Sequence, residues 1–247
     1  MIINVLTLFP EMFAPVITSS MLGKAVEKGI LEIRIIDIRD FSKDKHHKAD
    51  DTPFGGGAGM VLLAQPVFDA LKAKEACGKP LIHLSPRGKI INKNFLEELA
   101  QEEEIFLLCG HYEGIDQRII DYWEIEEVSI GDYILTGGEL PAMVLIDSLS
   151  RFIPQVLGCS DSVCDESIYS GLLEYPQYTK PREYLDLKVP EVLLNGNHKL
   201  IELWKLEQSL RLTKQRRPDL FEIFLAEKSS SLSKDEKKLL ERIQNEP

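Results

Sequence analysis

The chain has 247 residues, enough for one large domain or for two smaller domains joined by a linker. Its hydrophobic fraction of 44% is typical of a globular protein, and no apolar run reaches the roughly 18 residues that a membrane span needs. The formal net charge of −11 argues against a nucleic-acid binder, which is usually basic, so any contact with a polyanion must come from a local cluster.

The N-terminal stretch MIINVLTLFPEMF has neither a basic region nor a small-residue cleavage site, which argues against a secretory signal peptide. The cysteines show no CxxC and no zinc-finger spacing; they are Cys77, Cys109, Cys159 and Cys164. In a chain of this length we expect them to be reduced thiols in a cytoplasmic protein.

Short apolar segments in the first 130 residues are predicted to be β-strands: 1–8, 31–38, 80–84, 104–109 and 126–130. The second of these places Leu31, Ile33 and Ile35 on one face at a period of two. Helical spacing of apolar residues is found in 94–100 and in 141–153. Strands that alternate with helices predict an α/β fold with a mostly parallel sheet covered on both faces.

The composition changes after about residue 158. Residues 159–170, CSDSVCDESIYS, are small, polar and acidic, which is typical of a linker. Beyond them, helices are predicted at 199–217 and 234–244, separated by a break at Ser229–Ser231. The sequence therefore predicts an α/β domain, a hinge loop and a smaller helical domain.

Three glycine-rich segments stand out: DDTPFGGGAGM at 50–60, CGHYEGIDQR at 109–118, and SIGDYILTGGELP at 129–141. Two of them follow a predicted strand directly, where parallel sheets place their ligand crevices. Any one of them alone is as readily a tight turn as a ligand site. The chain has no GxxxxGK[ST] and no GxGxxG that opens a helix, so neither a P-loop nor an ordinary dinucleotide site is predicted. These segments contain few Lys or Arg, so the expected ligand is uncharged or modestly charged and held by backbone groups.

Together with SRFIPQVLG, GLLEYPQYTKP, VPEVLLNGNH and QRRPDLF, these segments closely resemble the TrmD-type tRNA (guanine-N1)-methyltransferases of the SPOUT superfamily. The resemblance runs over nearly the whole chain. It implies an α/β fold with a SPOUT-type parallel sheet, a deep trefoil knot and a small C-terminal helical domain. It also implies a knotted cofactor-binding domain at 1–158, a flexible linker at 159–172, a helical tRNA-binding domain at 173–247, and a homodimer with active sites at the subunit interface.

The resemblance further implies S-adenosylmethionine as methyl donor and tRNA as substrate. The implied donor pocket comprises Leu84, Pro86, Gly110, Tyr112, Glu113, Gly114, Ser129, Ile130, Gly131, Asp132, Tyr133, Ile134, Leu135, Gly137, Gly138 and Pro141. Substrate binding is assigned to Asp50, Gly55, Gly56, Gly57, Gly59, Lys214, Arg216 and Arg217. A Mg²⁺ requirement with Glu113 near the donor is also implied, but no protein metal site is predicted, because adjacent His46 and His47 have no further ligands at suitable spacing.

The family's reaction methylates N1 of the guanine just 3′ of the anticodon, position 37. That nitrogen carries a proton at neutral pH, so a base must remove it while a cation or hydrogen-bond donor stabilises the charge on O6. Arg151 matches the family's catalytic arginine and is expected at O6 or in orienting the base. Without the resemblance, Arg151 and Asp147 would be interpreted as an ordinary i, i+4 surface pair.

The general base is the point at which the chain departs from the family pattern. The family has Asp-Ser-Phe, with the aspartate five residues before the glycine of GLL. Counting back from Gly171 gives Glu166, and Asp165 lies one position earlier. Glu166 is favoured because Ser167 and Ile168 keep the register of Ser-Phe; Asp165 would need a one-residue shift. A solvated acidic loop is the alternative for both.

Local basic charge is found in 199–218. Lys199, Lys205, Arg211, Lys214, Arg216 and Arg217 against Glu202 and Glu207 give six minus two, or +4. Apolar residues at helical spacing, Leu200, Leu203, Trp204 and Leu210, are expected to face the domain core, leaving the cations for phosphates or for a solvated face.

Two other functions remain open at this point: a SPOUT methyltransferase for another RNA base, and a non-catalytic RNA-binding relative, which the altered base makes plausible. A nucleotide-hydrolysing protein is disfavoured by the missing P-loop.

Overall fold

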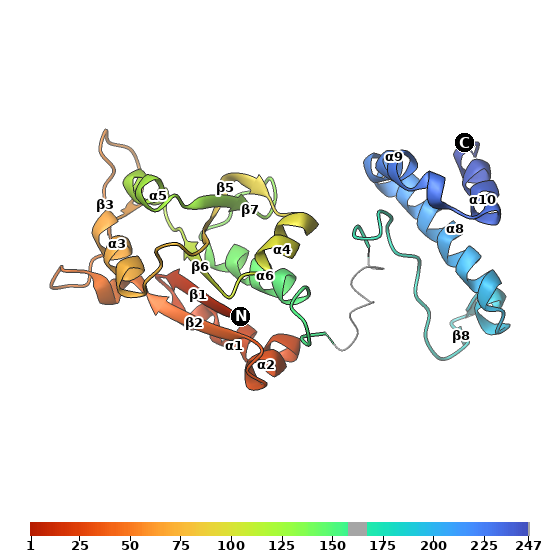
Figure 1. Cartoon of the computed structure of the whole chain (residues 1–247), viewed down its shortest axis with the longest axis horizontal. Helices are drawn as coiled ribbons and strands as arrows, with labels where there is room; N and C mark the ends of the chain where they lie inside the picture. The colour runs from red at the N-terminus through yellow and green to blue at the C-terminus, as the bar shows by residue number, and fades with distance from the viewer. Residues whose placement is uncertain (158–166, 247) are drawn as a thin grey trace. The chain divides into compact units, whose positions relative to one another are not determined.

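The protein is described by a computed structural model covering residues 1–157 and 167–246 (Figure 1). It divides into two compact units, Met1–Ser160 and Asp161–Pro247, which we describe separately. The predicted general bases, Glu166 and Asp165, lie outside the described residues.

The first unit is built on a five-stranded sheet with the order β2-β1-β6-β5-β7. Its strands are β1 (Ile2–Thr7), β2 (Glu32–Asp37), β5 (Leu81–Ile90), β6 (Glu104–Cys109) and β7 (Glu126–Ser129). Every neighbouring pair is parallel, with Leu6 opposite Leu108 and Leu84 opposite Cys109. The predicted parallel α/β sheet is therefore confirmed.

Helices cover both faces of this sheet (Figure 1). On one face lie α2 (Ser20–Glu27), α4 (Lys93–Leu99) and α6 (Glu139–Ser150), and on the other α3 (Ala64–Ala73) and α5 (Gln117–Trp123). Successive side chains along a strand point to opposite faces of the sheet, which explains this arrangement. In β6, Ile105 and Leu107 pack into the first cluster, whereas Phe106 and Leu108 pack into the second. Both faces of the strands are buried, so their sequences are almost continuously apolar.

Shorter elements connect these layers. The strand β2 is preceded by α1 (Ala14–Ile17), which follows the 3₁₀ turn η1 (Pro10–Met12), and it is followed by η2 (Ile38–Phe41). A two-residue antiparallel pair, β3 (Asp50–Asp51) with β4 (Val61–Leu62), brackets the first glycine-rich segment. This pairing holds residues 52–60 as a loop whose two ends are fixed.

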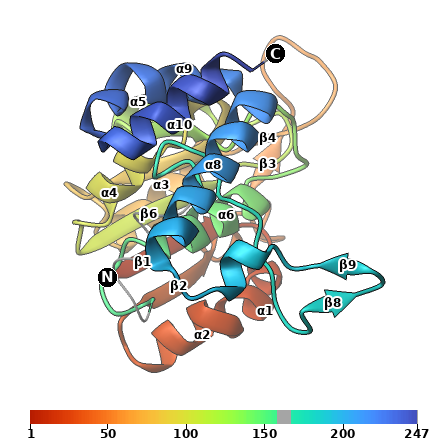
Figure 2. The same cartoon turned by 90° about the vertical axis from the view of Figure 1, so that its right-hand side faces the viewer.

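The second unit is helical, with α8 (His198–Arg216), α9 (Pro218–Glu227) and α10 (Lys234–Gln244), and with the short turns η3 (Glu191–Leu194) and η4 (Ser229–Ser231). Figure 2 shows the three helices together and a separate hairpin of β8 (Glu183–Tyr184) and β9 (Leu187–Lys188). The core is formed by Leu172, Leu210, Phe221, Phe224, Leu240 and Ile243. The helix predicted at 234–244 starts at a capping box, in which Ser233 and Glu236 satisfy each other's backbone N–H groups.

Candidate active site

The middle of β5 and the loops that follow β6 and β7 line a cavity of about 350 Å³ in the first unit. All of the residues assigned to the methyl donor line this cavity except Asp132, whose side chain is exposed. The structure also adds residues that the sequence did not indicate: His83, Ser85, Arg87, His111, Ile115, Ile120, Val128 and Thr136. Ligands in parallel sheets bind beyond the carboxyl ends of strands. His83 lies near the end of the strand predicted at 80–84 and Ser85 directly follows it, which was the available signal.

Two of the loops touch each other through glycine. The Gly138 N–H donates a hydrogen bond to the carbonyl oxygen of Gly110 over 2.7 Å. A Cβ atom on Gly138 would lie 2.7 Å from the Cα of Cys109, nearer than real Cβ contacts allow. The absence of a side chain at Gly138 therefore lets the backbones of residues 109–110 and 137–138 meet, which fixes one wall of the cavity.

The floor of the cavity carries little charge. His83 is buried, and its Nδ1 lies 3.0 Å from the carbonyl oxygen of Leu108. Burial lowers the pKa of His83, so the ring is neutral at physiological pH. Ser129 Oγ donates to the carbonyl oxygen of Gly131 and accepts from its N–H, which stabilises the turn after β7. Backbone polar groups and neutral side chains thus form the base of the site.

The first glycine-rich segment lies against another wall. The Glu113 N–H donates to the carbonyl oxygen of Met60 over 3.0 Å, and a Cβ on Gly59 would collide with the Glu113 side chain at 2.5 Å. Tyr112 lies beside Asp50, and partial burial, followed by the charge of Asp50, raises the pKa of the Tyr112 phenol. Asp50 and Gly59, assigned to the substrate, therefore neighbour the donor cavity without lining it.

The tip of the same segment holds Gly55, Gly56 and Gly57, which leave open space around their backbone. Phe54, at this tip, is fully exposed. This part of the segment is therefore exposed to solvent in the described part of the first unit.

Arg151 lies at the other end of α6 from the cavity. It is the half-buried C-cap residue of this helix, whereas Pro141 near the start of the helix lines the cavity. Arg151 follows Pro141 by ten positions, which correspond to roughly 15 Å along the helix axis. Within one chain, Arg151 is thus separated from the donor cavity.

The composition of the cavity fits a nucleoside better than a polyphosphate. Arg87 is the single Lys or Arg in its lining, and its guanidinium pairs with Glu127 at 2.8 Å. The volume lies at the lower end of the range of about 300–1,000 Å³ found for small-molecule sites. Backbone groups from β5 and from the loops after β6 and β7, with Pro86, Ile134 and Leu135, suit a flat and weakly charged ligand.

Within residues 1–157 and 167–246, no group of three or more His, Cys, Asp or Glu side chains is placed to hold a metal ion. His46 and His47 lie in an exposed loop, where His47 Nδ1 is 3.3 Å from the carbonyl oxygen of Arg39.

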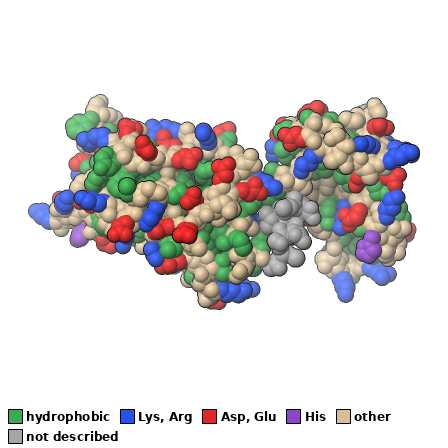
Figure 3. Space-filling view, in the orientation of Figure 1, with side chains coloured by type: hydrophobic (Ala, Val, Ile, Leu, Met, Phe, Trp, Pro, Cys, Tyr) green, Lys and Arg blue, Asp and Glu red, His purple; other side chains and the backbone are tan. Residues whose placement is uncertain are grey.

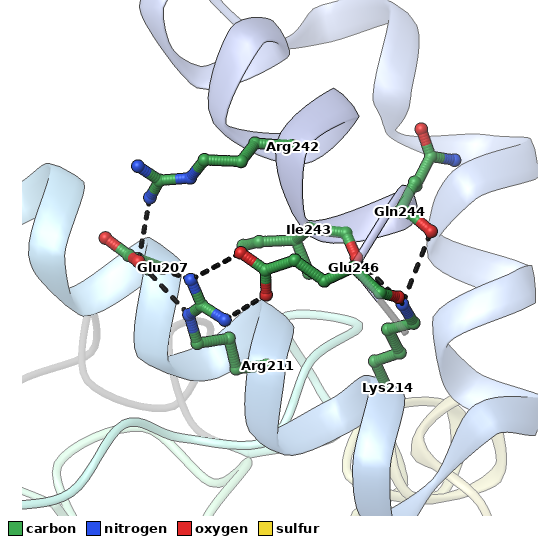
Figure 4. Close-up of polar contacts among 7 residues, drawn as sticks. All are labelled: Glu207, Arg211, Lys214, Arg242, Ile243, Gln244 and Glu246. Atoms are coloured by element: carbon green, nitrogen blue, oxygen red, sulfur yellow. Dashed lines mark hydrogen bonds and ion pairs between the residues drawn. The ribbon is translucent and has the colours of Figure 1, made fainter.

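Most cations of α8 are engaged inside the second unit rather than directed to a partner (Figure 4). Arg211 pairs with both Glu207 and Glu246, and Glu207 also pairs with Arg242 of α10. Lys214 donates to the carbonyl oxygens of Ile243 and Glu246 at the end of α10, at 2.8 and 2.6 Å. These contacts join α10 to α8.

The two arginines at the end of α8 differ from the other cations. Arg217 pairs only with its near neighbour Asp219, at 2.6 Å, and Arg216 is exposed and forms no ion pair with any described residue. On the face drawn in Figure 3, basic and acidic side chains are interspersed and do not form one basic patch. Of the apolar residues expected in the core, Leu210 is fully buried, Leu203 and Trp204 are half-buried, and Leu200 is 47% exposed.

The helices of the described chain include none with the length and apolar character required to span a bilayer.

Comparisons with known proteins give one consistent result. The family model described as tRNA (Guanine-1)-methyltransferase TrmD matches residues 1–223. A protein of Ruminiclostridium cellulolyticum named tRNA (guanine-N(1)-)-methyltransferase is 56% identical over 221 residues, which cover 88% of this chain and 95% of the relative. Proteins of the same name from Clostridioides difficile and Clostridium perfringens are 53% and 52% identical, covering 88% and 96% of this chain and 96% and 98% of the relatives.

Proposed function

The chain belongs to the tRNA (guanine-N1)-methyltransferase family, and we propose that it transfers a methyl group from S-adenosylmethionine to N1 of guanine 37 of tRNA. The observation that carries the proposal is the meeting of residues 83–87 of β5 with the glycine-rich segments 109–118 and 129–141 around one weakly charged cavity. S-adenosylmethionine supplies an electrophilic methyl group on a positively charged sulfur. A site made largely of backbone groups and neutral side chains suits its adenosine.

The residues of the chain have two tasks in this reaction. A carboxylate removes the N1 proton of guanine, which typically contributes about 10²–10⁴-fold. Glu166 is the favoured base and Asp165 the alternative. Arg151 stabilises the negative charge that develops on O6, or orients the base. We assign the linker that carries the carboxylates to residues 159–172, between a catalytic domain at 1–158 and a tRNA-binding domain at 173–247.

A homodimer is part of this proposal. The separation of Arg151 from the cavity along α6 supports a site completed by a second subunit. The same helix exposes Leu140 and Val144, one turn apart, and apolar side chains on a helix surface favour burial against a partner. The trefoil knot implied by the resemblance is likewise proposed, and the tight packing of Gly138 on Gly110 supports chain segments passing close to one another.

A Mg²⁺ ion fits this site through Glu113, because Mg²⁺ commonly uses one or two protein carboxylates and takes its other ligands from water and substrate. Glu113 lines the cavity and is exposed to solvent.

We also propose that the enzyme acts in the cytoplasm, because its proposed substrate is tRNA.

We expect the double variant Arg216→Gln, Arg217→Gln to bind tRNA less tightly and with a smaller dependence on salt. Removal of one phosphate contact lowers the slope of log affinity against log salt by about 1. Lys199→Gln provides a matched removal of charge on α8, because Lys199 is paired with Asp235. Filter binding at several salt concentrations measures both quantities. A salt slope equal to that of the unmodified protein would remove these arginines from the proposal.

The function is tested by methyl transfer from labelled S-adenosylmethionine to unmodified tRNA transcripts. Transcripts with guanine at position 37 are expected to be methylated, and transcripts with adenine there are not. Mapping of the modified nucleotide separates this activity from methylation of another RNA base. Donor binding without any transfer would indicate a non-catalytic RNA-binding relative instead.

A further inference from the structure

Glu139, the first residue of α6, is a carboxylate buried in the first unit. Its side chain is 2% exposed, and its Oε1 accepts a hydrogen bond from Thr7 Oγ1 over 2.8 Å. Thr7 ends β1 and is itself fully buried. Among the described residues, no Lys or Arg forms an ion pair with Glu139. A buried carboxylate with one neutral donor is costly unless positive charge lies nearby.

The second oxygen of this carboxylate lies directly behind the wall of the cavity. A Cβ placed on Gly137 would be 2.4 Å from Glu139 Oε2 and 2.7 Å from the ring of His111. Gly137 and Gly138 both line the cavity, whereas Glu139 does not. A single glycine, without a side chain, therefore separates the carboxylate from the cavity.

Glu139 occupies the first position of α6. The side chain lies at the N-terminus of α6, where the helix dipole stabilises negative charge, and Thr7 donates to it. Its charge acts on the cavity side as well. Cys109 immediately precedes the cavity residue Gly110. Burial raises the pKa of the Cys109 thiol, and the negative charge of Glu139 raises it further.

We propose that Glu139 recognises the positive charge of the methyl donor and so distinguishes the donor from the product. In the transfer, the bond from sulfur to the methyl carbon breaks, the methyl carbon bonds to N1, and the base takes the N1 proton. The sulfur keeps the electron pair, so the sulfonium becomes a neutral thioether. Glu139 therefore loses its positive partner once the methyl group has left, and the product is held less tightly relative to the donor. This inference depends on the proposed function.

The test is calorimetric binding of S-adenosylmethionine and of S-adenosylhomocysteine to the full chain. Glu139→Gln keeps the shape and the acceptor for Thr7 but removes the charge. We expect it to weaken binding of the charged donor on the order of tenfold, and binding of the neutral thioether by less than about twofold. Equal losses for the two ligands, or no loss, would overturn the proposal.

Three further variants separate this effect from general disturbance. Glu126→Gln removes an exposed charge at the opposite end of β7 and is expected to leave the donor-to-product ratio unchanged. Thr7→Val removes the hydrogen bond but keeps the carboxylate, and should also preserve the ratio. Glu139→Met replaces the carboxylate by an apolar side chain of similar length, so it tests the same ratio if Glu139→Gln does not fold. Failure of the unmodified protein to bind either nucleoside would refute the proposed function itself, whereas an unchanged ratio would refute the role of Glu139 alone.

Discussion

Replacement of Glu166 by Gln is expected to lower the rate of methyl transfer by about 10²–10⁴-fold, because the amide cannot take the N1 proton of guanine. Binding of S-adenosylmethionine should be unchanged, since the donor cavity is formed by other residues. Single-turnover transfer to a guanine-37 transcript measures the chemical step, and calorimetry measures donor binding. A large loss of rate with normal donor affinity is the result that a general base requires.

Asp165→Asn is the matched control, because it removes the same charge one position earlier. Near-normal transfer by Asp165→Asn supports Glu166 as the base. The reverse pattern would assign the base to Asp165 and indicate a one-residue shift of the linker. If both variants transfer methyl groups at the unmodified rate, neither carboxylate is the base. If Glu166→Gln lowers the rate of methyl transfer by less than expected, Glu166 acts as a base but its side chain, longer than the aspartate of the family, is held slightly out of position. A displacement of about 1 Å can cost roughly 10²-fold in rate.

Gly138→Ala is expected to have the second large effect, on donor binding. The backbone at Gly138 has φ −82° and ψ −6°, which alanine readily adopts, so the expected harm comes from space alone. The new methyl group would lie 2.7 Å from the Cα of Cys109 and 2.8 Å from the Gly110 nitrogen, which are backbone atoms that cannot rotate away. The two loops must separate, and we expect donor affinity to fall by at least about tenfold and transfer by about 10²-fold.

The same substitution should lower the free energy of unfolding by about 1–3 kcal/mol, as overpacking in a core usually does. Urea denaturation measures this quantity. Gly29→Ala is the control, because Gly29 has φ +69° and a Cβ there would meet no atom within 4 Å, so it tests backbone strain without a clash. It should cost roughly 1 kcal/mol and leave donor affinity unchanged. Normal donor binding by Gly138→Ala would show that the loop contact does not shape the cavity.

The strands were predictable because their apolar residues carry a local signal. Residues 104–109 were predicted as a strand and form β6 with the same bounds. The strand predicted at 80–84 instead runs from Leu81 to Ile90. The extension over residues 85–90 was missed because SPRGK is polar. These residues are held as a strand by pairing with β7, whose register shifts after Leu84, so that Lys89 also lies opposite Val128.

Several helices were missed for a related reason. α3 and α5 each bury one face against the sheet, yet each is short and begins inside or just after a glycine-rich motif that was interpreted as loop. α9 begins with Pro218 at its first position. Proline there is a signal for the start of a helix, but it was not used in the prediction. In these segments tertiary packing contributes the stability that a short helix lacks in isolation.

The prediction for the basic helix shows where composition is insufficient. The sequence contains six Lys and Arg residues in 199–218, but it does not indicate which of them form ion pairs or hydrogen bonds within the folded unit. The structure directs Arg211 and Lys214 to α10, because the end of that helix brings Glu246 and free carbonyl groups within reach. Only the folded unit distinguishes these residues from Arg216 at the exposed end of α8.

By itself the sequence determined the local elements with strong periodicity, the motifs that carry the family resemblance, and the residues expected around the methyl donor. Only the tertiary structure decided the strand order, the contact of Gly138 with Gly110, and the burial of Glu139 behind the cavity wall. The physical reason is that periodicity and turn chemistry depend on neighbours in the chain. The partners of Glu139 lie up to 132 residues away, and packing of the whole sheet and its helices brings them together.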